Sequence, residues 1–423
     1  MFVLPMKSLH SNVREPHGRR HCEALLRTWA VPALFVAIAA PVHAATITAS
    51  SCSQANVASA LAGASPGDTV RVPAGTCSWS GGISLSGVQL VGAGSSTAGT
   101  VITAGLVTMN KHASAYTRLS GVRFTGADSH VAVYGSPSAR PYIVDNNYFN
   151  ANVSGLAIQL RVNGGLVHHN QLVAASPTSA DMFNIPTSED WSQAPTFGAD
   201  DTTGERNIYF EDNTISGLLE TAPDGDQGSR LVIRNNTYTD SSIVFHGGAP
   251  QDSSAGGGTR QFEVYNNTFV RVSNAVAINK WIWVRGSTGV IANNNMARAD
   301  SPDGSSYPNK SEIRLTLACP NAYPMQYQVG QSSPTPQNPP TRPLLIFGNT
   351  GAGATDGNFI TVGSSDTAGG SCSTPSDYIK SGRDFVLSNA WGWKPYTYPH
   401  PLQSLTAGTS TGLLPPSDLR VIP

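Results

Sequence analysis

The sequence predicts an all-β protein: a single-stranded, right-handed parallel β-helix with an N-terminal cap helix and long inserted loops. The main observation is a short phrase that returns six times between Tyr142 and Met296, with four strand-like residues, one or two polar residues, an Asn, any residue and a large apolar residue. The anchoring asparagines are Asn147, Asn170, Asn213, Asn236, Asn267 and Asn294, separated by 23, 43, 23, 31 and 27 residues. A repeat of this length predicts a solenoid, because one such unit cannot bury its own apolar face and must stack on its neighbours.

Alternation within the phrase is the second observation, because successive side chains of a strand point to opposite sides. The third residue before each Asn and the second after it are apolar, which predicts two inward columns. The residue two before each Asn then points outward. This outward column consists of Asp145, His168, Glu211, Arg234, Tyr265 and Ala292. The asparagines are expected to stack at a turn, bonded from coil to coil through their side-chain amides and tolerating left-handed backbone geometry.

Composition is the third observation. Charged residues make up only 13% of the chain and Gly is abundant, with 42 residues, while apolar residues at 39% suffice for a long core. This composition is typical of a turn-rich β protein and not of a disordered chain. The longer gaps between the asparagines are interpreted either as coils with inserted loops or as pairs of coils whose middle phrase has decayed.

Residues 1–44 have the features of a signal peptide. Basic residues precede an apolar run, and Val42-His43-Ala44 is a plausible cleavage site; the run is too short for a spanning helix. We therefore expect a secreted protein, extracellular or periplasmic, made of residues 45–423 and without a membrane anchor. Those residues carry a net charge of −4, which argues against a generally basic nucleic-acid binder. We expect a monomer.

Four cysteines remain in that part of the chain, Cys52, Cys77, Cys319 and Cys372, and they allow three pairings. Proximity in the sequence favours Cys52–Cys77 and Cys319–Cys372. A four-cysteine metal site is the weaker alternative, because no C-x-x-C pair is present.

The order of elements follows from local signals. Residues 53–61 read as a short amphipathic cap helix with Ser53 as its N-cap, and such a cap would close the exposed end of the first coil. The segments GDTVRVPAGT and VQLVG read as strand–turn units that open the coils. We expect coils over residues 67–351 and a C-terminal extension over 352–423, folded back along the solenoid.

On these motifs the chain resembles the right-handed parallel β-helix proteins of the pectate-lyase-like superfamily, from about Ile47 to Gly351. The resemblance rests on the cap helix, GDTVRVPAGT, VQLVGAG and the repeated Asn phrases. It implies a carbohydrate-active protein, because members are mostly extracellular polysaccharide lyases and glycoside hydrolases, with some epimerases, adhesins and phage spikes. The Arg-x-Pro-Arg signature of pectate lyases and the motif set of polygalacturonases are absent from this sequence, so no family active site carries over residue by residue.

The candidate site is therefore taken from the outward column, whose adjacent members should lie about 4.8 Å apart. The residues predicted to be catalytic are His168, Glu211, Arg234, His246, Arg260 and Glu263. Those predicted to bind substrate are Asp145, Tyr265, Trp191 and Arg230. The alternative is a solvated outer face with complementary charges in ladder.

Two further segments add chemistry. Asp224 and Asp226 lie in a Gly-rich turn, and their hard oxygen ligands suit Ca²⁺. His246 and Arg260 lie at the two ends of one inserted loop. In the segment 280–285, alternation places Trp281, Trp283 and Arg285 on one side, either as a sugar platform or, as the sequence slightly favours, beneath the C-terminal extension.

The mixture of Arg, His and acid favours a polysaccharide lyase that cleaves an acidic, uronate-containing glycan by β-elimination, with a base near the reacting carbon and a cation for the developing charge. A glycoside hydrolase with paired carboxylates is the alternative enzyme. A non-catalytic surface β-helix of the adhesin type is the alternative outside catalysis. No nucleotide-binding or zinc-protease motif is present.

Overall fold

The computed structural model describes residues 44–126, 131–150, 157–178, 183–186, 194–201, 204–219, 222–247, 258–272, 278, 280–297, 311–317, 323–324, 328–331, 335, 337–351, 359–364, 376 and 378–405. All of these lie within the compact unit that spans residues 43–423. Residues 1–43 of the predicted signal peptide, Trp191, Cys319 and Cys372 lie outside the described residues, so the signal peptide, the role of Trp191 and the Cys319–Cys372 bridge stay predictions.

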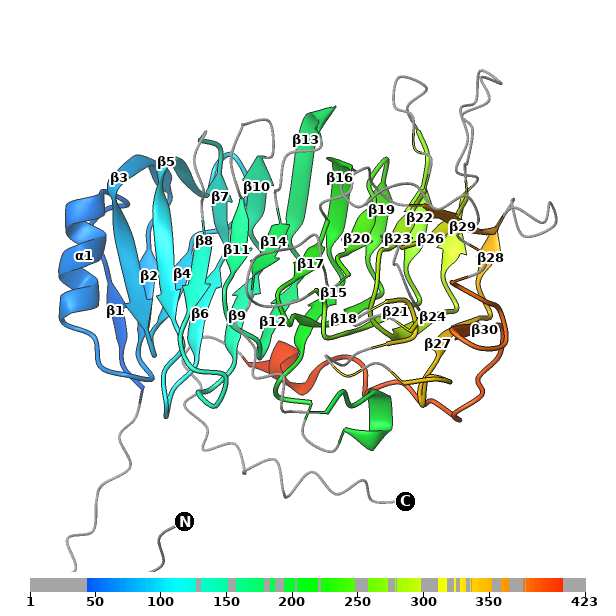
Figure 1. Ribbon diagram of the computed structural model, residues 1–423. Helices are drawn as coiled ribbons and strands as arrows, with labels where there is room; N and C mark the ends of the chain where they lie inside the picture. The colour runs from blue at the N-terminus through cyan, green and yellow to red at the C-terminus, as the bar shows by residue number, and fades with distance from the viewer. Residues whose placement is uncertain are drawn as a thin grey trace, which may run out of the picture. The chain divides into compact units, whose positions relative to one another are not determined.

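The described chain is a parallel β-helix, which confirms the predicted fold class. Its coils succeed one another from β1 to β30 (Figure 1). Three ladders of parallel strands run along it, and we call their outer surfaces the first, second and third faces. The first ladder holds β1 (Thr46–Thr48), β2 (Thr69–Val72), β4 (Gln89–Gly92), β6 (Thr117–Ser120), β9 (Tyr142–Asp145), β12 (Gly165–His168), β15 (Ile208–Glu211), β18 (Arg230–Arg234), β21 (Gln261–Tyr265), β24 (Gly289–Ala292), β27 (Leu344–Phe347) and β30 (Phe385–Val386).

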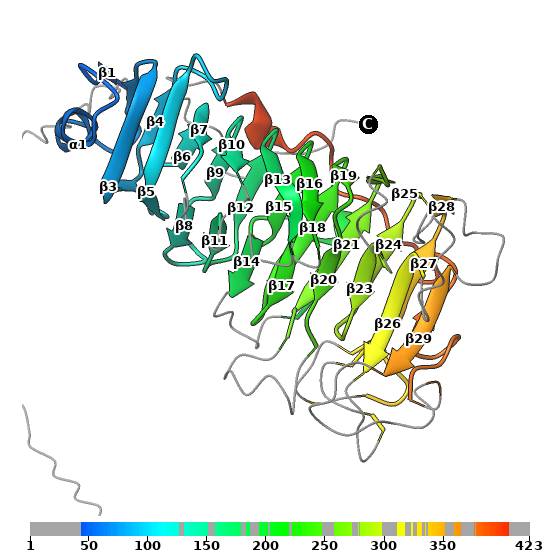
Figure 2. The same cartoon turned by 90° about the horizontal axis from the view of Figure 1, so that it is seen from above.

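The other two ladders are joined through two long strands, β3 (Gly75–Ser86) and β5 (Thr100–Asn110), which belong to both. The second ladder continues with β7 (Val122–Phe124), β10 (Tyr148–Asn150), β13 (Gln171–Thr178), β16 (Thr214–Leu218), β19 (Thr237–Thr239), β22 (Thr268–Val270), β25 (Asn295–Met296) and β28 (Thr350–Gly351). The third continues with β8 (Val131–Tyr134), β11 (Ile158–Leu160), β14 (Phe183–Pro186), β17 (Asp224–Asp226), β20 (Ile243–Phe245), β23 (Ile282–Val284), β26 (Ile313–Leu317) and β29 (Ile360–Ser364). Figure 2 shows the strands of the third ladder side by side from β8 to β29.

The repeated asparagines form a continuous ladder between the first and second ladders. The Asn147 backbone N–H and side-chain Nδ2 both donate to Oδ1 of Asn170, at 3.0 and 3.1 Å. The same pair of bonds recurs from coil to coil up to Asn349, which was not among the six asparagines predicted from the sequence. The left-handed backbone belongs to the residue before each Asn, such as Asp212 with φ of 59°, and not to the ladder Asn as expected. The rows of amide bonds satisfy buried polar groups that would otherwise destabilise the turn.

The strand register also resolves the uneven repeat. His168 on β12 pairs directly with Glu211 on β15, so the 43-residue gap is one coil with an insertion and not two coils. Both predicted apolar columns, such as Val167 before the Asn and Leu172 after it, lie in the core.

The N-terminal end is closed as predicted. Helix α1 (Gln54–Ala62) starts after Ser53, whose side chain accepts a hydrogen bond from the backbone N–H of Asn56. The disulfide Cys52–Cys77 is present and ties the helix entry to β3.

The C-terminal end differs from the expected division at residue 351. Strands β29 and β30 still pair with the coils, so the winding continues to Val386. The segment that follows, residues 387–405, runs back along the first face (Figures 1 and 2) and is called the strap. It contains one short 3-10 helix, η4 (Pro401–Ser404). No helix among the described residues is long and apolar enough to cross a membrane.

Candidate functional site

The predicted outward column is assembled as expected, with its members side by side on the first face. Asp145 pairs with His168, His168 with Glu211, Glu211 with Arg234, and Arg234 with Tyr265 in the strand register. The prediction that this column faces water is wrong, however. Asp145, Glu211 and Arg234 are 0% exposed, because the strap lies over them.

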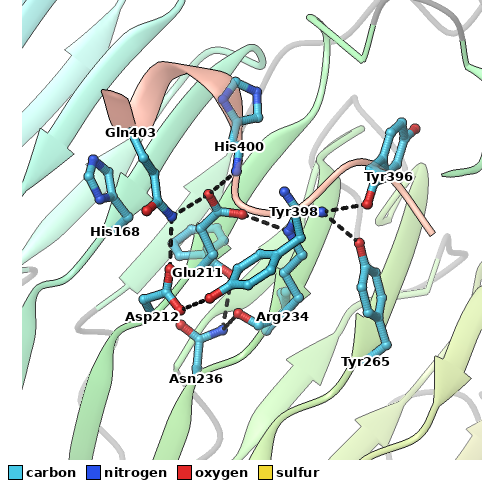
Figure 3. A network of polar contacts seen from close by, with 12 residues as sticks. His168, Glu211, Asp212, Arg234, Asn236, Tyr265, Tyr396, Tyr398, His400 and Gln403 are labelled. Carbon is cyan, nitrogen blue, oxygen red and sulfur yellow. Dashed lines mark hydrogen bonds and ion pairs between the residues drawn. The ribbon is translucent and has the colours of Figure 1, made fainter. Parts of the chain in front are cut away.

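The Glu211 carboxylate shows how completely the strap engages the column (Figure 3). Its Oε2 accepts from Arg234 Nε at 2.6 Å, while its Oε1 accepts from the His400 backbone N–H at 3.0 Å and from Gln403 Nε2 at 2.6 Å. Arg234 donates in addition to the Tyr265 hydroxyl and to the Tyr396 carbonyl, each at 3.0 Å. These groups are therefore occupied by protein partners, and both ends of the ion pair are tied to the strap.

Asp145 and His168 are held in the same way at the N-terminal side of the column. Asp145 accepts two hydrogen bonds of 2.7 Å from Arg118 and one of 2.9 Å from Ser120. His168 lies with its Nδ1 2.9 Å from Nδ1 of His169, and burial lowers the pKa of His168 to about 4. The imidazole is accordingly neutral at pH 7, and the residue is only 4% exposed.

Two other predicted site residues, Glu263 and Arg230, also lie beneath cover. Glu263 accepts from the Gly198 backbone N–H at 2.7 Å and from Trp393 Nε1 at 2.8 Å, and burial raises its pKa to about 8. Arg230 donates to Gln261 Oε1 at 2.8 Å and is 1% exposed. The 3-10 helix η1 (Gly198–Asp200) and the residues next to it thus close this part of the face.

A signal in the sequence could have revealed the cover. The position four residues before each ladder Asn also points outward, and it is mostly apolar. Its members are Ile143, Leu166, Tyr209, Val232, Glu263 and Val290. Apart from Glu263, they form a second apolar cluster outside the coils, together with Phe197, Trp393, Leu402 and Leu405. An outward apolar row predicts a covering segment, because exposed apolar patches of that size are uncommon.

The chemistry that remains accessible lies on the third face. Asp224 and Asp226 are on β17, His246 directly follows β20, and Arg285 directly follows β23. Nε2 of His246 lies 3.0 Å from Oδ1 of Asp224, close enough for an ion pair although not aligned as a hydrogen bond. NH1 of Arg285 lies 3.1 Å from Nδ1 of His246 and 3.4 Å from its Nε2. The side chain of His246 keeps a fifth of its surface accessible, in contrast to the column of the first face.

Trp283 extends this group toward the C-terminal coils. Its ring is half-buried, with Lys280 Nζ 4.3 Å, Arg285 Cζ 5.0 Å and Arg314 Cζ 5.9 Å from its centre, and its Nε1 donates to Thr316. The expected packing of the tryptophans beneath the extension is wrong. Trp281 lies in the core between the coils, and the strap covers the first face while Trp283 lies on the third.

The chemistry of the two neighbours indicates which nitrogen of His246 accepts a hydrogen bond. A guanidinium can only donate, so the imidazole nitrogen that Arg285 contacts is an acceptor. Nδ1 is the nearer acceptor to Arg285 NH1, at 3.1 Å against 3.4 Å for Nε2, while Nε2 lies 3.0 Å from Asp224 Oδ1. A carboxylate on one side of an imidazole and a lone pair on the other is the arrangement of a general base whose orientation is fixed.

Arg260 flanks the same loop as His246, as expected, but its side chain is buried. The Thr259 backbone N–H donates to the His246 carbonyl at 2.9 Å, so the two ends of the intervening loop do meet. The Arg260 side chain is nevertheless buried, 4% exposed, at the corner where the chain passes from the third ladder to β21. Of the residues predicted to be catalytic, only His246 is both accessible and close to other ionisable groups of the third face.

Comparisons with known proteins add little to this geometry. No family model matches the chain, and no curated protein matches it. Among solved structures, the alginate lyase from Paenibacillus sp. str. FPU-7 is similar at 16% identity and a TM-score of 0.35, over 59% of this chain and 94% of that one. The strand pairing itself shows the fold.

The predicted Ca²⁺ site was tested against the donor set. Asp224 and Asp226 point from the same side of β17, but within the described part of the chain no group of three or more acidic, His or Cys side chains is placed to hold a metal ion. Because Ca²⁺ takes six to eight oxygen ligands, two carboxylates are a partial set. Ca²⁺ at this site therefore stays a prediction.

Proposed function

We propose that this protein is a secreted polysaccharide lyase that cleaves an acidic, uronate-containing glycan on its third face. The observation that carries the proposal is the contact of His246 with Asp224 and Arg285 beside the half-buried ring of Trp283. β-Elimination needs a base for the proton next to the sugar carboxylate and a cation for the charge that develops there. These residues supply both at hydrogen-bond distance from one another.

The roles follow from the contacts. Arg285 binds the uronate carboxylate, and its withdrawal from His246 toward the substrate frees Nδ1. That nitrogen takes the proton from the carbon next to the carboxylate, a carbon–carbon double bond forms, and the glycosidic bond on the adjacent carbon breaks. The leaving oxygen receives a proton from the imidazolium or from water. Asp224 stabilises the positive charge that His246 carries between these steps.

Substrate positioning is assigned to Trp283 and its cations. An aromatic ring offers a flat apolar surface to a sugar ring, and Arg314 lies within about 6 Å of its centre, where a neighbouring carboxylate would gain from it. The group therefore favours an anionic glycan over a neutral one.

A glycoside hydrolase is the second candidate, on a specific observation. Asp224 and Asp226 lie two residues apart on β17 and hence on the same side of the strand, roughly 7 Å apart along it. Inverting hydrolases place their carboxylates about 6.5–9.5 Å apart. The predicted pairing of Glu211 with a neighbouring carboxylate is no longer suited to this role, because Glu211 is buried.

The test uses residues 45–423 on polymannuronate, polyguluronate, polygalacturonate, polyglucuronate and hyaluronan, each with and without Ca²⁺. Ultraviolet absorbance of unsaturated products is expected on at least one polymer, with a loss of about 100-fold or more in kcat for His246→Ala. The matched control is His112→Ala, a histidine in the turn after β5, which should retain full activity. Reducing ends without unsaturation would show a hydrolase; binding without turnover would overturn both enzymes in favour of the adhesin-type protein.

A further inference from the structure

The third face carries a second aromatic–arginine pair, far from His246. Tyr134 ends β8 and is 38% exposed, and the exposed Arg161 directly follows β11. The Arg161 backbone N–H donates to the Val133 carbonyl, and its guanidinium carbon lies 5.7 Å from the centre of the Tyr134 ring. Its Nε donates to Gln159 at 2.8 Å. Across the described residues, no carboxylate lies within ion-pair distance of Arg161.

The pair shares a row with the candidate site. Strand β8 pairs with β11, β11 with β14, β14 with β17 and β17 with β20, so four parallel steps lead from Tyr134 to the level of His246. At about 4.8 Å a step, the distance is roughly 19 Å, the length of several sugar units. The residues two apart on each strand keep the same outward direction, so both ends of the row face the same side of the coils.

The two ends have the same chemistry. A partly exposed aromatic ring with a guanidinium beside it is present at Tyr134 with Arg161, and again at Trp283 with Arg285 and Arg314. Such a pair matches a pyranose ring that bears a carboxylate, because the ring stacks on the aromatic surface and the guanidinium pairs with the charge. A polymer with one carboxylate per sugar would satisfy both ends at once.

We propose that Tyr134 and Arg161 form a distal subsite for a uronate residue of the same polymer, which lies along the third face parallel to the coil axis. This inference rests on the proposed function. It makes the protein an enzyme that acts within long chains, since both ends of a bound segment are held and bond cleavage takes place between them at His246.

The experiment measures binding, so that it does not depend on turnover. Trimers and octamers of mannuronate, guluronate, galacturonate and glucuronate are titrated calorimetrically into the His246→Ala protein and into the same protein carrying Tyr134→Ala or Arg161→Ala. Each added substitution is expected to weaken octamer binding about five- to tenfold and to leave trimer binding unchanged, because only the octamer spans both ends.

Tyr148→Ala is the matched control. It removes another half-buried tyrosine with an arginine over its ring, Arg123 at 3.6 Å, but on the second ladder, and octamer affinity should not change. Equal losses for trimer and octamer, or no loss for either, would overturn the distal subsite while leaving the proposed lyase intact if polymer cleavage still needs His246. Failure of every uronate oligomer and polymer to bind would overturn both.

Discussion

The first and third faces of this β-helix hold similar side chains in opposite circumstances. On the first face, Glu211 and Arg234 meet at 2.6 Å with no exposed surface, and both form further hydrogen bonds with the strap. On the third face, His246 and Asp224 meet at 3.0 Å with a fifth and a tenth of their side chains accessible. On both faces, an acidic residue, a histidine and an arginine lie on successive coils.

The difference teaches that a row of ionisable residues on a solenoid does not identify an active site. A buried row can be structural when its members have protein partners, and here some of those partners come from a segment more than 150 residues further along the chain, as in the contact of Glu211 with His400. Accessibility to solvent distinguishes the third-face group from the buried column of the first face. The following predictions sharpen that contrast, beginning with the largest effect.

A substitution in the buried column of the first face should lower the free energy of unfolding the most. Arg234→Met leaves the Glu211 carboxylate buried without its cation, and a loss of about 3–5 kcal/mol in the free energy of unfolding is expected. Urea denaturation measures it. Arg314→Met on the third face is the control, with an expected change within about 0.5 kcal/mol, because Arg314 is partly solvated. Similar losses for the two variants would contradict the division between a structural and an open face.

Substitution in the Asn ladder should give the second-largest loss in the free energy of unfolding. Asn236→Ala removes an amide that donates to the Phe210 carbonyl and to Asn267 Oδ1 and that accepts from the Asn213 backbone N–H. Buried polar groups are left without these bonds, and a loss of about 3 kcal/mol is expected. The neighbouring Asn235 has φ of 56°, so Asn235→Gly keeps its backbone geometry and should cost less than about 1 kcal/mol. A larger effect at Asn235 than at Asn236 in thermal unfolding would show that the turn and not the ladder holds the coils.

The smallest effect concerns pH. Burial raises the pKa of Glu263 from 4.5 to about 8, so its contribution to stability is complete below about pH 4.5 and is lost as pH rises through about 8. The free energy of unfolding should therefore fall as pH rises from about 4.5 to about 8 in the wild type, with a weaker fall in Glu263→Gln, which cannot ionise.

Low pH should also lower the free energy of unfolding, through His168 on the same face. Burial lowers the pKa of His168 from 6.5 to about 4, so the stability gained from its neutral form is present above pH 6.5 and is lost as pH falls through about 4. Denaturation curves of the wild type and of His168→Gln across pH 3–9 check both limbs. A wild type and Glu263→Gln that respond alike above pH 6.5 would show that Glu263 is ionised in the folded protein.

The sequence by itself determined the coils. The Asn phrase, with apolar residues three before and two after each Asn, specified the register, the inward columns and the turn, because these depend only on strand alternation and on like residues stacking in successive coils. The cap helix and the Cys52–Cys77 bridge were equally local, since Ser53 and the two cysteines lie within one coil of each other. Even the neighbours within the outward column were correctly placed.

Only the tertiary structure decided which face stays open. The strap reaches Glu211 and Arg234 from residues 396–403, and no local pattern specifies where a chain segment so distant in sequence will pack. The apolar outward row with Leu166 and Tyr209 indicated that something covers the first face, but not what. His246, Asp224, Trp283 and Arg285 come from three different coils, and their approach depends on the lengths of the insertions between them, which strand alternation does not determine.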